Sequence, residues 1–312
     1  MAVEIVQTTP MPPAIQQALD RDYTVHRLWE AKDRDALLKE VAPRIRGMVT
    51  SGGVGAQPPL IEALPKLEVI SSFGVGYDSI DIDCAKRRGV IVTNTPDVLT
   101  DDVADTAMAL LLAMMRRIPQ GDQFVRQGRW PKDKFPLTDK LGGKVMGVLG
   151  LGRIGQAIAR RAEPFNVEIR YFGPRKKAGI AWRYYDDLVA MAKDVDILMI
   201  ACPGGKETEK LVNAAVIDAL GPKGYVVNIA RGSVVEEPAL VTALVTGKLA
   251  GAGLDVFADE PNVPEALWTL DSVTLAPHVG SATHATRQAM GDLVLKNLAA
   301  HFAGQPVLTR VV

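Results

Sequence analysis

The stretch K-V-M-G-V-L-G-L-G-R-I-G-Q-A-I-A-R-R-A, residues 144–162, decides the fold that we predict for this chain. It begins with a short apolar run that is typical of a buried β-strand, and it ends with a helical pattern. Between the two lie Gly150, Gly152 and Gly155. We expect Gly150 to allow a tight turn, Gly152 to let an anionic group approach the backbone, and Gly155 to let the helix pack on the strand.

The same alternation of strand and helix patterns runs through nearly the whole chain, which predicts parallel sheets covered by helices. Strands are expected near residues 3–6, 23–28, 47–50, 67–72 and 89–94, and again near 144–149, 167–171, 196–201, 225–230, 250–256 and 272–276. Helices are expected near residues 13–20, 32–42, 59–64, 82–88, 101–117 and 283–303. The predicted fold is α/β, with two Rossmann-like or flavodoxin-like doubly wound parallel-sheet domains and a cleft between them.

The last helix pattern follows the final strand of the second sheet, so we expect it to pack back on the first domain. This predicts a flavodoxin-like substrate-binding domain of residues 1–97 plus 285–312 and a Rossmann NAD(P)-binding domain of residues 98–284. The helix that opens the second domain has Thr100 as its expected cap and is apolar on most faces. Two interpretations of that helix stay open: a buried core helix, or a helix that packs in part against a second subunit.

Composition narrows the class of protein. The chain has 312 residues, 47% of them hydrophobic, and its 36 basic and 36 acidic side chains cancel. A uniform nucleic-acid or membrane-surface binder would show a basic excess, so neither partner is expected. The longest apolar run, 107–115, is too short to cross a bilayer, and no secretory signal is visible. Cys84 and Cys202 are expected to be buried thiols, and the four histidines form no metal cluster, which favours a soluble cytoplasmic protein without a metal site.

Residues 171–177, Y-F-G-P-R-K-K, lie where dinucleotide-binding folds usually carry an acid that binds the adenine ribose of NAD. This chain has Phe172 there, followed after a glycine and a proline by three cations. The guanidinium of Arg175 can bind the 2′-phosphate of NADP through two hydrogen bonds. A solvated basic turn is the alternative, but it leaves the missing acid unexplained. We therefore predict NADPH as the cofactor, with NADH as a weaker second.

Three polar residues follow successive predicted strands. Arg231 lies in N-I-A-R-G, Glu260 in L-D-V-F-A-D-E-P and His278 in A-P-H-V-G-S. Open α/β sheets bind ligands at the carboxyl ends of their strands, so these loops are candidate catalytic loops. A guanidinium can hold a carboxylate and polarise the adjacent carbonyl, and an imidazolium oriented by a carboxylate can protonate that carbonyl oxygen. Alone, each residue reads more simply as a structural or surface group; together they predict reduction of a 2-oxo acid.

With these residues and their motifs, the chain resembles the D-isomer-specific 2-hydroxyacid dehydrogenases. Within that family it resembles the glyoxylate/hydroxypyruvate reductase and hydroxyphenylpyruvate reductase branch. The resemblance covers nearly the whole length. Its motifs are F-G-V-G-Y-D-S-I-D (73–81), N-T-P-D-V-L-T-D-D-V-A-D (94–105), G-L-G-R-I-G (150–155), C-P-G-G-K-E-T (202–208), N-I-A-R-G, D-V-F-A-D-E-P and P-H-V-G-S.

The resemblance implies roles for particular residues. Arg231, Glu260 and His278 would be the catalytic three, and the backbone around Val75 and Gly76 would hold the substrate carboxylate together with Arg231 and His278. The cofactor would contact Gly150, Gly152, Arg153, Ile154, Gly155, Gly173, Arg175, Lys176, Cys202, Pro203, Thr208, Ala230, Asp255, His278 and Gly280. The family makes D-2-hydroxy acids and is dimeric through its cofactor domain, and this branch prefers NADPH.

The sequence also departs from the family pattern. Gly205 replaces a hydroxyl residue of the cofactor loop, although Thr208 remains. Mammalian-type glyoxylate reductases carry a second tryptophan after the one matching Trp130, where this chain has Asp133, so their substrate preference does not transfer. Whether Trp130 or Phe135 reaches a partner's active site stays open. The alternatives are an NAD(H)-dependent dehydrogenase of another 2-hydroxy acid, a formate dehydrogenase, which would carry glutamine in place of Glu260, and a dinucleotide-sensing regulatory protein.

Overall fold

The computed structural model describes residues 2–312 and divides them into two compact units. The first unit contains the chain up to Leu99 together with Ser281–Val312, and the second is Thr100–Gly280. The chain therefore passes between the units at 99–100 and 280–281, whereas the sequence pattern predicted domain boundaries at 97–98 and 284–285. The predicted α/β class with two parallel-sheet domains is confirmed, since every strand pair in both sheets is parallel.

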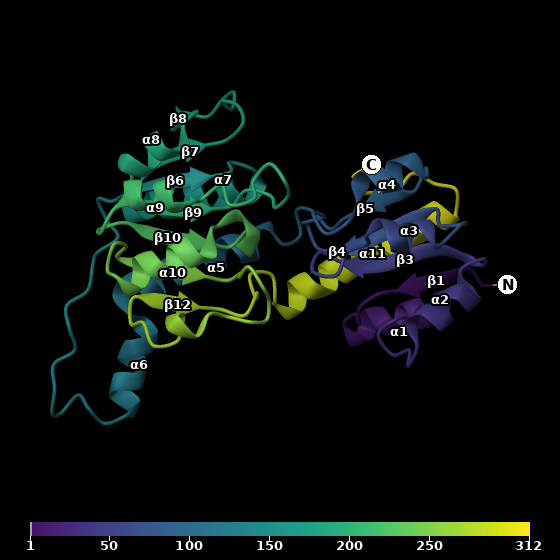
Figure 1. Ribbon diagram of the computed structural model, residues 1–312, viewed down its shortest axis with the longest axis horizontal. Helices are drawn as coiled ribbons and strands as arrows, with labels where there is room; N and C mark the ends of the chain where they lie inside the picture. The colour runs from purple at the N-terminus through teal and green to yellow at the C-terminus, as the bar shows by residue number, and fades with distance from the viewer. Residues whose placement is uncertain (1) are drawn as a thin grey trace. The chain divides into compact units, whose positions relative to one another are not determined.

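The first unit is built on a five-stranded sheet with the order β2-β1-β3-β4-β5 (Figure 1). Its strands are β1 (Glu4–Gln7), β2 (Thr24–Arg27), β3 (Ile45–Ser51), β4 (Val69–Phe73) and β5 (Ile91–Thr93). Its helices are α1 (Pro13–Asp22), α2 (Arg34–Val41), α3 (Pro58–Glu62), α4 (Ile82–Arg87) and the long C-terminal α11 (His284–Phe302). The expected return of the last helix to the first domain is what the structure shows, because α11 packs on β4 and α1. A Cβ on Gly291 of α11 would lie 2.2 Å from Ile15 of α1, so only glycine allows this approach.

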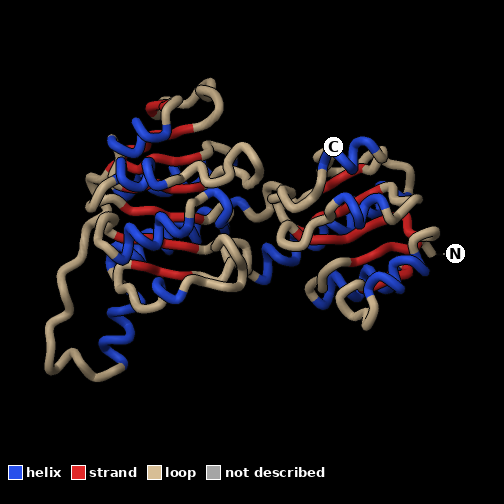
Figure 2. The backbone as a smooth tube through the Cα atoms, viewed as in Figure 1, coloured by secondary structure: helices blue, strands red, loops and turns tan. Residues whose placement is uncertain are grey.

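The second unit is built on a seven-stranded sheet with the order β12-β11-β10-β9-β6-β7-β8, and Figure 2 shows its strands stacked with helices on both sides. Its strands are β6 (Val145–Leu149), β7 (Glu168–Phe172), β8 (Arg183–Tyr185), β9 (Ile197–Ile200), β10 (Tyr225–Asn228), β11 (Gly251–Leu254) and β12 (Val273–Leu275). Its α-helices are α5 (Thr100–Arg116), α6 (Ile118–Arg126), α7 (Arg153–Ala162), α8 (Leu188–Lys193), α9 (Ala214–Leu220) and α10 (Glu237–Val245). Edge strand β8 was not predicted, because three residues of R-Y-Y show no usable alternation.

Helix α5 is a core helix of the second unit. Eight of its residues are buried, and it packs against α7 and β11. This supports the core-helix interpretation left open by the sequence. Arg161 of α7 ties the two helices together through ion pairs with Asp101 and Asp105, at 2.8 and 2.6 Å. Thr100 is the first helical residue and not the cap, so the expected capping position is wrong by one residue.

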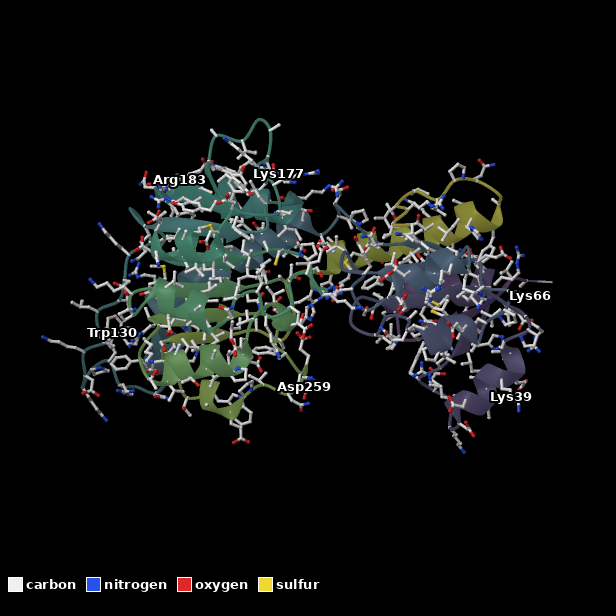
Figure 3. The ribbon with its side chains drawn as sticks, turned by 45° about the horizontal axis from the view of Figure 1, so that its top comes forward. Lys39, Lys66, Trp130, Lys177, Arg183 and Asp259 are labelled. Atoms are coloured by element: carbon white, nitrogen blue, oxygen red, sulfur yellow. The ribbon has the colours of Figure 1, made fainter. Side chains whose placement is uncertain are left out.

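Helix α6 and the coil after it form an arm, residues 118–140, that extends away from the seven-stranded sheet (Figures 1 and 2). The arm has a small core of its own: the rings of Phe124 and Phe135 meet edge to face at 5.4 Å, and the guanidinium of Arg129 lies over Phe124 at 4.7 Å. Several of its large apolar side chains are exposed, including Trp130, labelled in Figure 3, and Leu137. Such exposure in a segment this long is typical of an interaction surface.

Over residues 2–312, no helix combines the length and the apolar character that a membrane span requires. The same residues contain no group of three histidine, cysteine or acidic side chains placed to hold a metal ion. Cys84 and Cys202 are both free and buried.

Candidate active site

The glycine loop connects β6 to α7 in the second unit, as predicted. Gly150 has a φ of +94°, and a Cβ there would lie 2.5 Å from the Cα of Cys202. A Cβ on Gly155 would lie 2.2 Å from the carbonyl oxygen of Gly150, so α7 can start this close to the strand only without a side chain. Gly152 differs, because nothing lies within 4 Å of its Cβ position and it supplies no capping side chain to α7. That open space at a helix N-terminus fits a phosphate group.

The loop after β9 lies against this turn and carries Cys202 and Pro203. Burial raises the pKa of the Cys202 thiol to about 11, so this cysteine is a packing residue and not a nucleophile. Thr208 donates a hydrogen bond from its hydroxyl to the carbonyl of Pro203 at 2.7 Å, with Gly205 as a second acceptor at 3.2 Å. Gly205 has a φ of +129°, which suits glycine and disfavours the hydroxyl residue it replaces.

The basic turn, residues 173–177, joins β7 to the coil before β8. Arg175 and Lys176 are exposed, and no carboxylate among residues 2–312 pairs with either side chain. No acid stands at the end of β7, where Phe172 is the last strand residue. The turn therefore offers two unneutralised cations to a ligand anion. Figure 3 labels Lys177 at its end, and Arg183 where the chain enters β8.

Arg231 follows β10 and is fixed by its neighbours in N-I-A-R-G. The Asn228 side chain accepts from the Ala230 N–H at 3.0 Å and donates to the Arg231 carbonyl at 2.9 Å. The Arg231 guanidinium donates to the Ala230 carbonyl at 2.8 Å. A Cβ on Gly232 would lie 1.9 Å from the carbonyl of Phe257. The Arg231 loop is therefore packed against the backbone that leads to Glu260.

Glu260 and His278 are in direct contact, as the sequence led us to expect. One carboxylate oxygen of Glu260 lies 2.7 Å from Nδ1 of His278, and the other accepts from the Phe257 N–H at 3.0 Å. Because a carboxylate only accepts, Nδ1 carries the proton, and Nε2 is the nitrogen available to a ligand. The His278 side chain is 44% exposed and that of Glu260 is 35% exposed, so a small molecule can reach both.

Asp255 holds the loop that carries His278. Its two carboxylate oxygens accept from the N–H groups of Val279 and Gly280 at 2.7 and 2.8 Å, and its carbonyl accepts from the His278 N–H at 2.9 Å. Desolvation raises the pKa of this buried carboxyl, and the two backbone donors oppose that shift. His278 itself has a φ of +54°, a left-handed conformation that costs free energy in a residue with a side chain. The three bonds to Asp255 stabilise it in that conformation.

Val75 and Gly76 lie in the first unit, in the loop after β4. The Asn94 side chain donates to the Val75 carbonyl at 2.8 Å, and Thr95 exchanges hydrogen bonds with Gly74. Within residues 2–312, no acceptor is present for the N–H groups of Val75 and Gly76. Two adjacent unsatisfied N–H groups suit a carboxylate.

The structure thus brings the predicted residues Glu260 and His278 into direct contact, and it shows further residues that support the site. Within the second unit, the loops after β6, β7, β9, β10, β11 and β12 share one edge of the parallel sheet, and they carry the predicted cofactor and catalytic residues of that unit. Sequence reasoning missed the supporting roles of Asn228, Gly232 and Asn94, although all three stand inside or next to the motifs quoted above. The only signal for them was their position at the end of a strand.

A glycine loop between strand and helix and a histidine–carboxylate pair at the same sheet edge define a dinucleotide-binding α/β enzyme. Residues 108–280 match the family model described as D-isomer specific 2-hydroxyacid dehydrogenase, NAD binding domain. The chain belongs to this family, and the resemblance seen in its motifs is confirmed. It is an enzyme of the reductase and dehydrogenase type.

Close relatives cover the chain from end to end. It is 50% identical over 311 residues to a hydroxyphenylpyruvate reductase of Plectranthus scutellarioides, covering 100% of this chain and 99% of that protein. It is 43% identical over 309 residues to a 2-ketogluconate reductase of Gluconobacter oxydans, covering 99% and 98%. A crystal structure of an NADPH-dependent glyoxylate/hydroxypyruvate reductase from Sinorhizobium meliloti, in complex with NADP and malonate, superposes with a TM-score of 0.95 at 46% identity, covering 100% and 97%.

Proposed function

We propose that this chain is an NADPH-preferring reductase that converts small 2-oxo acids, such as glyoxylate or hydroxypyruvate, into D-2-hydroxy acids. The observation that carries the proposal is the 2.7 Å pair of His278 and Glu260 at the ligand-binding edge of the sheet. The unpaired cations of the basic turn support the choice of cofactor. The relative from Sinorhizobium meliloti, described as NADPH-dependent and as acting on glyoxylate and hydroxypyruvate, supports both choices.

The proposed roles follow from the chemistry of each group. Reduction of a 2-oxo acid adds a hydride to the carbonyl carbon and a proton to its oxygen, and bound NADPH would supply the hydride. His278 donates the proton from Nε2, and Glu260 orients the ring through its contact with Nδ1. Arg231 binds the substrate carboxylate and polarises the carbonyl. The N–H groups of Val75 and Gly76 are the proposed carboxylate donors of the first unit.

The residues of the second unit fit the cofactor. The uncovered Gly152 leaves room for the pyrophosphate, and the absence of an acid at Phe172 removes the group that would repel a 2′-phosphate. Arg175 and Lys176 are the proposed partners of that phosphate. Ile154, Gly173, Thr208, Ala230 and Gly280 remain proposed cofactor contacts.

The test of this function is an absorbance assay of nicotinamide oxidation with NADPH and NADH against glyoxylate, hydroxypyruvate, pyruvate, phenylpyruvate and 2-ketogluconate. We expect turnover with the small 2-oxo acids and a higher kcat/KM with NADPH. Turnover of phenylpyruvate or 2-ketogluconate alone would move the substrate proposal to another 2-hydroxy acid. No turnover of any substrate, with cofactor binding intact, would favour a dinucleotide-sensing role.

The preference for NADPH over NADH is tested separately by substitutions in the basic turn and at Phe172. Arg175→Ala removes a charge-assisted contact of about 1.5–3 kcal/mol, so NADPH should bind about 10- to 150-fold more weakly while NADH binding changes little. Adding Phe172→Asp should then invert the preference, because the new carboxylate repels the phosphate and accepts from the ribose hydroxyls of NADH. Equal losses for both cofactors in Arg175→Ala would refute the phosphate contact.

We also propose that the enzyme is a cytoplasmic homodimer joined through its cofactor-binding unit. The support is the arm of residues 118–140, on which Ile118, Val125, Trp130 and Leu137 are 58, 54, 69 and 100% exposed. Burying such side chains against a second subunit is favourable. Sedimentation equilibrium should give the mass of a dimer, and a monomer mass at micromolar concentration would contradict the proposal.

A further inference from the structure

Two tyrosine hydroxyls hold the two ends of the basic turn. Tyr171 lies in β7, and its hydroxyl accepts a hydrogen bond from the Lys177 N–H at 2.9 Å. Tyr184 lies in β8, and its hydroxyl donates to the Gly173 carbonyl at 3.1 Å. The first bond fixes residue 177 and the second fixes residue 173, so the segment with Arg175 and Lys176 is tied down on both sides.

Packing alone accounts for the rings of these tyrosines but not for their hydroxyls. Tyr171 and Tyr184 are partners in the β7–β8 register, and their rings meet at 5.4 Å. Tyr171 is completely buried, so a phenylalanine would fill the same space. What the hydroxyls add are the two hydrogen bonds to the turn.

The turn has little else to hold its shape. Arg175 and Lys176 are exposed and unpaired, as described above, and Gly179 follows at a φ of +75°. An unsupported loop of this kind would lose conformational entropy when it closes on a ligand. Support for the backbone reduces that loss and leaves the cationic side chains free for the anion.

We propose that Tyr171 and Tyr184 are positioning residues that hold the basic turn in the conformation that binds the 2′-phosphate, and that they thereby contribute to the preference for NADPH over NADH. The inference rests on the proposed function, in which Arg175 and Lys176 bind that phosphate. It extends the cofactor site to two residues that touch no ligand themselves.

Tyr185 provides a matched control in the same strand. Its hydroxyl donates to Asp194 at 2.6 Å and accepts from the Arg170 guanidinium at 3.2 Å, and it makes no hydrogen bond to the basic turn. Tyr185→Phe therefore removes the hydroxyl of a buried tyrosine in β8 and leaves the hydrogen bonds to residues 173–177 intact. Any effect common to Tyr184→Phe and Tyr185→Phe belongs to the stability of the sheet edge.

The experiment compares Tyr171→Phe, Tyr184→Phe, the double variant, Tyr185→Phe and Arg175→Ala in the full-length enzyme. Calorimetry gives the Kd of NADPH and NADH, and of adenosine 2′,5′-bisphosphate against AMP, a pair that differs only in the 2′-phosphate. Each single hydroxyl deletion should weaken the two 2′-phosphorylated ligands about 2- to 12-fold, and the double variant should weaken them further. The tyrosine variants should bind NADH and AMP nearly as the parent does, and Tyr185→Phe should bind all four ligands with little change in affinity. Thermal unfolding checks that each variant is folded.

The outcomes separate this inference from the proposed function. If Arg175→Ala loses NADPH selectively while Tyr171→Phe and Tyr184→Phe bind both cofactors as the parent does, or lose both equally, the positioning role is wrong and the phosphate contact stands. If Arg175→Ala itself shows no selectivity, the proposed phosphate contact fails, and the inference built on it fails with it. Selective loss in both tyrosine variants and in Arg175→Ala supports the two together.

Discussion

The basic turn and the loop that carries His278 differ in which of their groups are fixed by hydrogen bonds. In the His278 loop, Asp255 bonds the backbone and Glu260 bonds the imidazole, so both the chain and the side chain are held. In the basic turn only the backbone is held, by Tyr171 and Tyr184, and the cations remain exposed and unpaired. A group that must transfer a proton at one atom needs a fixed orientation, whereas a cation that receives a mobile phosphate needs freedom to adapt.

The comparison predicts effects of different kind and size. Changes in the His278 loop should lower kcat, because they disturb the reacting groups. Changes in the basic turn should alter cofactor affinity and leave kcat of the saturated enzyme nearly intact.

The largest effect is expected from the proposed proton donor. His278→Ala should lower kcat by about 10²–10⁴-fold and leave NADPH binding close to the parent value. Because His278 has a positive φ, His278→Asn is a useful second variant, since asparagine tolerates that conformation better than alanine. His26→Ala is the matched control, because His26 also pairs with a glutamate, Glu4 at 2.8 Å. Steady-state rates at saturating cofactor measure the loss, and parental turnover in both His278 variants would exclude it as the donor.

The next effect concerns the substrate carboxylate. Arg231→Lys should lower kcat and raise KM together, with kcat/KM reduced about 10²-fold, because an ammonium cannot replace two parallel hydrogen bonds. Arg183→Lys, an exposed arginine of β8, is the control and should leave both constants near the parent values. A change in KM alone would mean that Arg231 binds the ground state and the transition state equally.

A smaller loss is expected at the carboxylate partner of the histidine. Glu260→Gln keeps an oxygen that can accept from the Phe257 N–H but removes the charge next to Nδ1, so kcat should fall about 10-fold. Glu237→Gln is a close control, since Glu237 accepts from the Ala258 N–H at 2.9 Å in the same loop and does not contact the imidazole. Similar losses in both variants would show that loop stability, and not the charge beside His278, determines the rate.

Much of this arrangement could be predicted because strand-end position is visible in the sequence. Arg231, Glu260 and His278 each follow an apolar run, and parallel strands end at the same edge, so their loops had to be neighbours. The glycine loop was predictable from spacing for the same reason. The Glu260–His278 hydrogen bond followed from the chemistry once the loops were placed.

The details that hold these residues were not predictable, since each depends on contacts between segments distant in sequence. The positive φ of His278 depends on Asp255, and the shape of the basic turn depends on the hydroxyl of Tyr184 in a strand too short to recognise. Gly232 shows the same limit. A side chain there would clash with the carbonyl of Phe257, and no local sequence pattern indicates that contact.

The smallest predicted effect, and the sharpest test of the difference between the two regions, is a response to salt. Exposed charges are screened by ions, and the screening length falls from about 30 Å at 0.01 M to about 8 Å at 0.15 M ionic strength. The cations of the basic turn are exposed, so NADPH binding should weaken about 2- to 5-fold more than NADH binding over this range. Comparing the salt dependence of NADPH binding with that of NADH binding removes the contribution of the pyrophosphate, which both cofactors share.

The same change in salt should leave kcat at saturating NADPH nearly constant, because the Glu260–His278 pair is a direct hydrogen bond at 2.7 Å with no room for ions between its atoms. Arg175→Ala should lose most of the extra salt dependence of NADPH. Titrations of NADPH and NADH at the two ionic strengths, with the parent and Arg175→Ala, measure this salt dependence of cofactor binding. Equal salt dependence of NADPH and NADH in the parent would mean that the basic turn does not bind the 2′-phosphate, and a fall in kcat with salt would mean that the His278 loop is less rigid than its hydrogen bonds indicate.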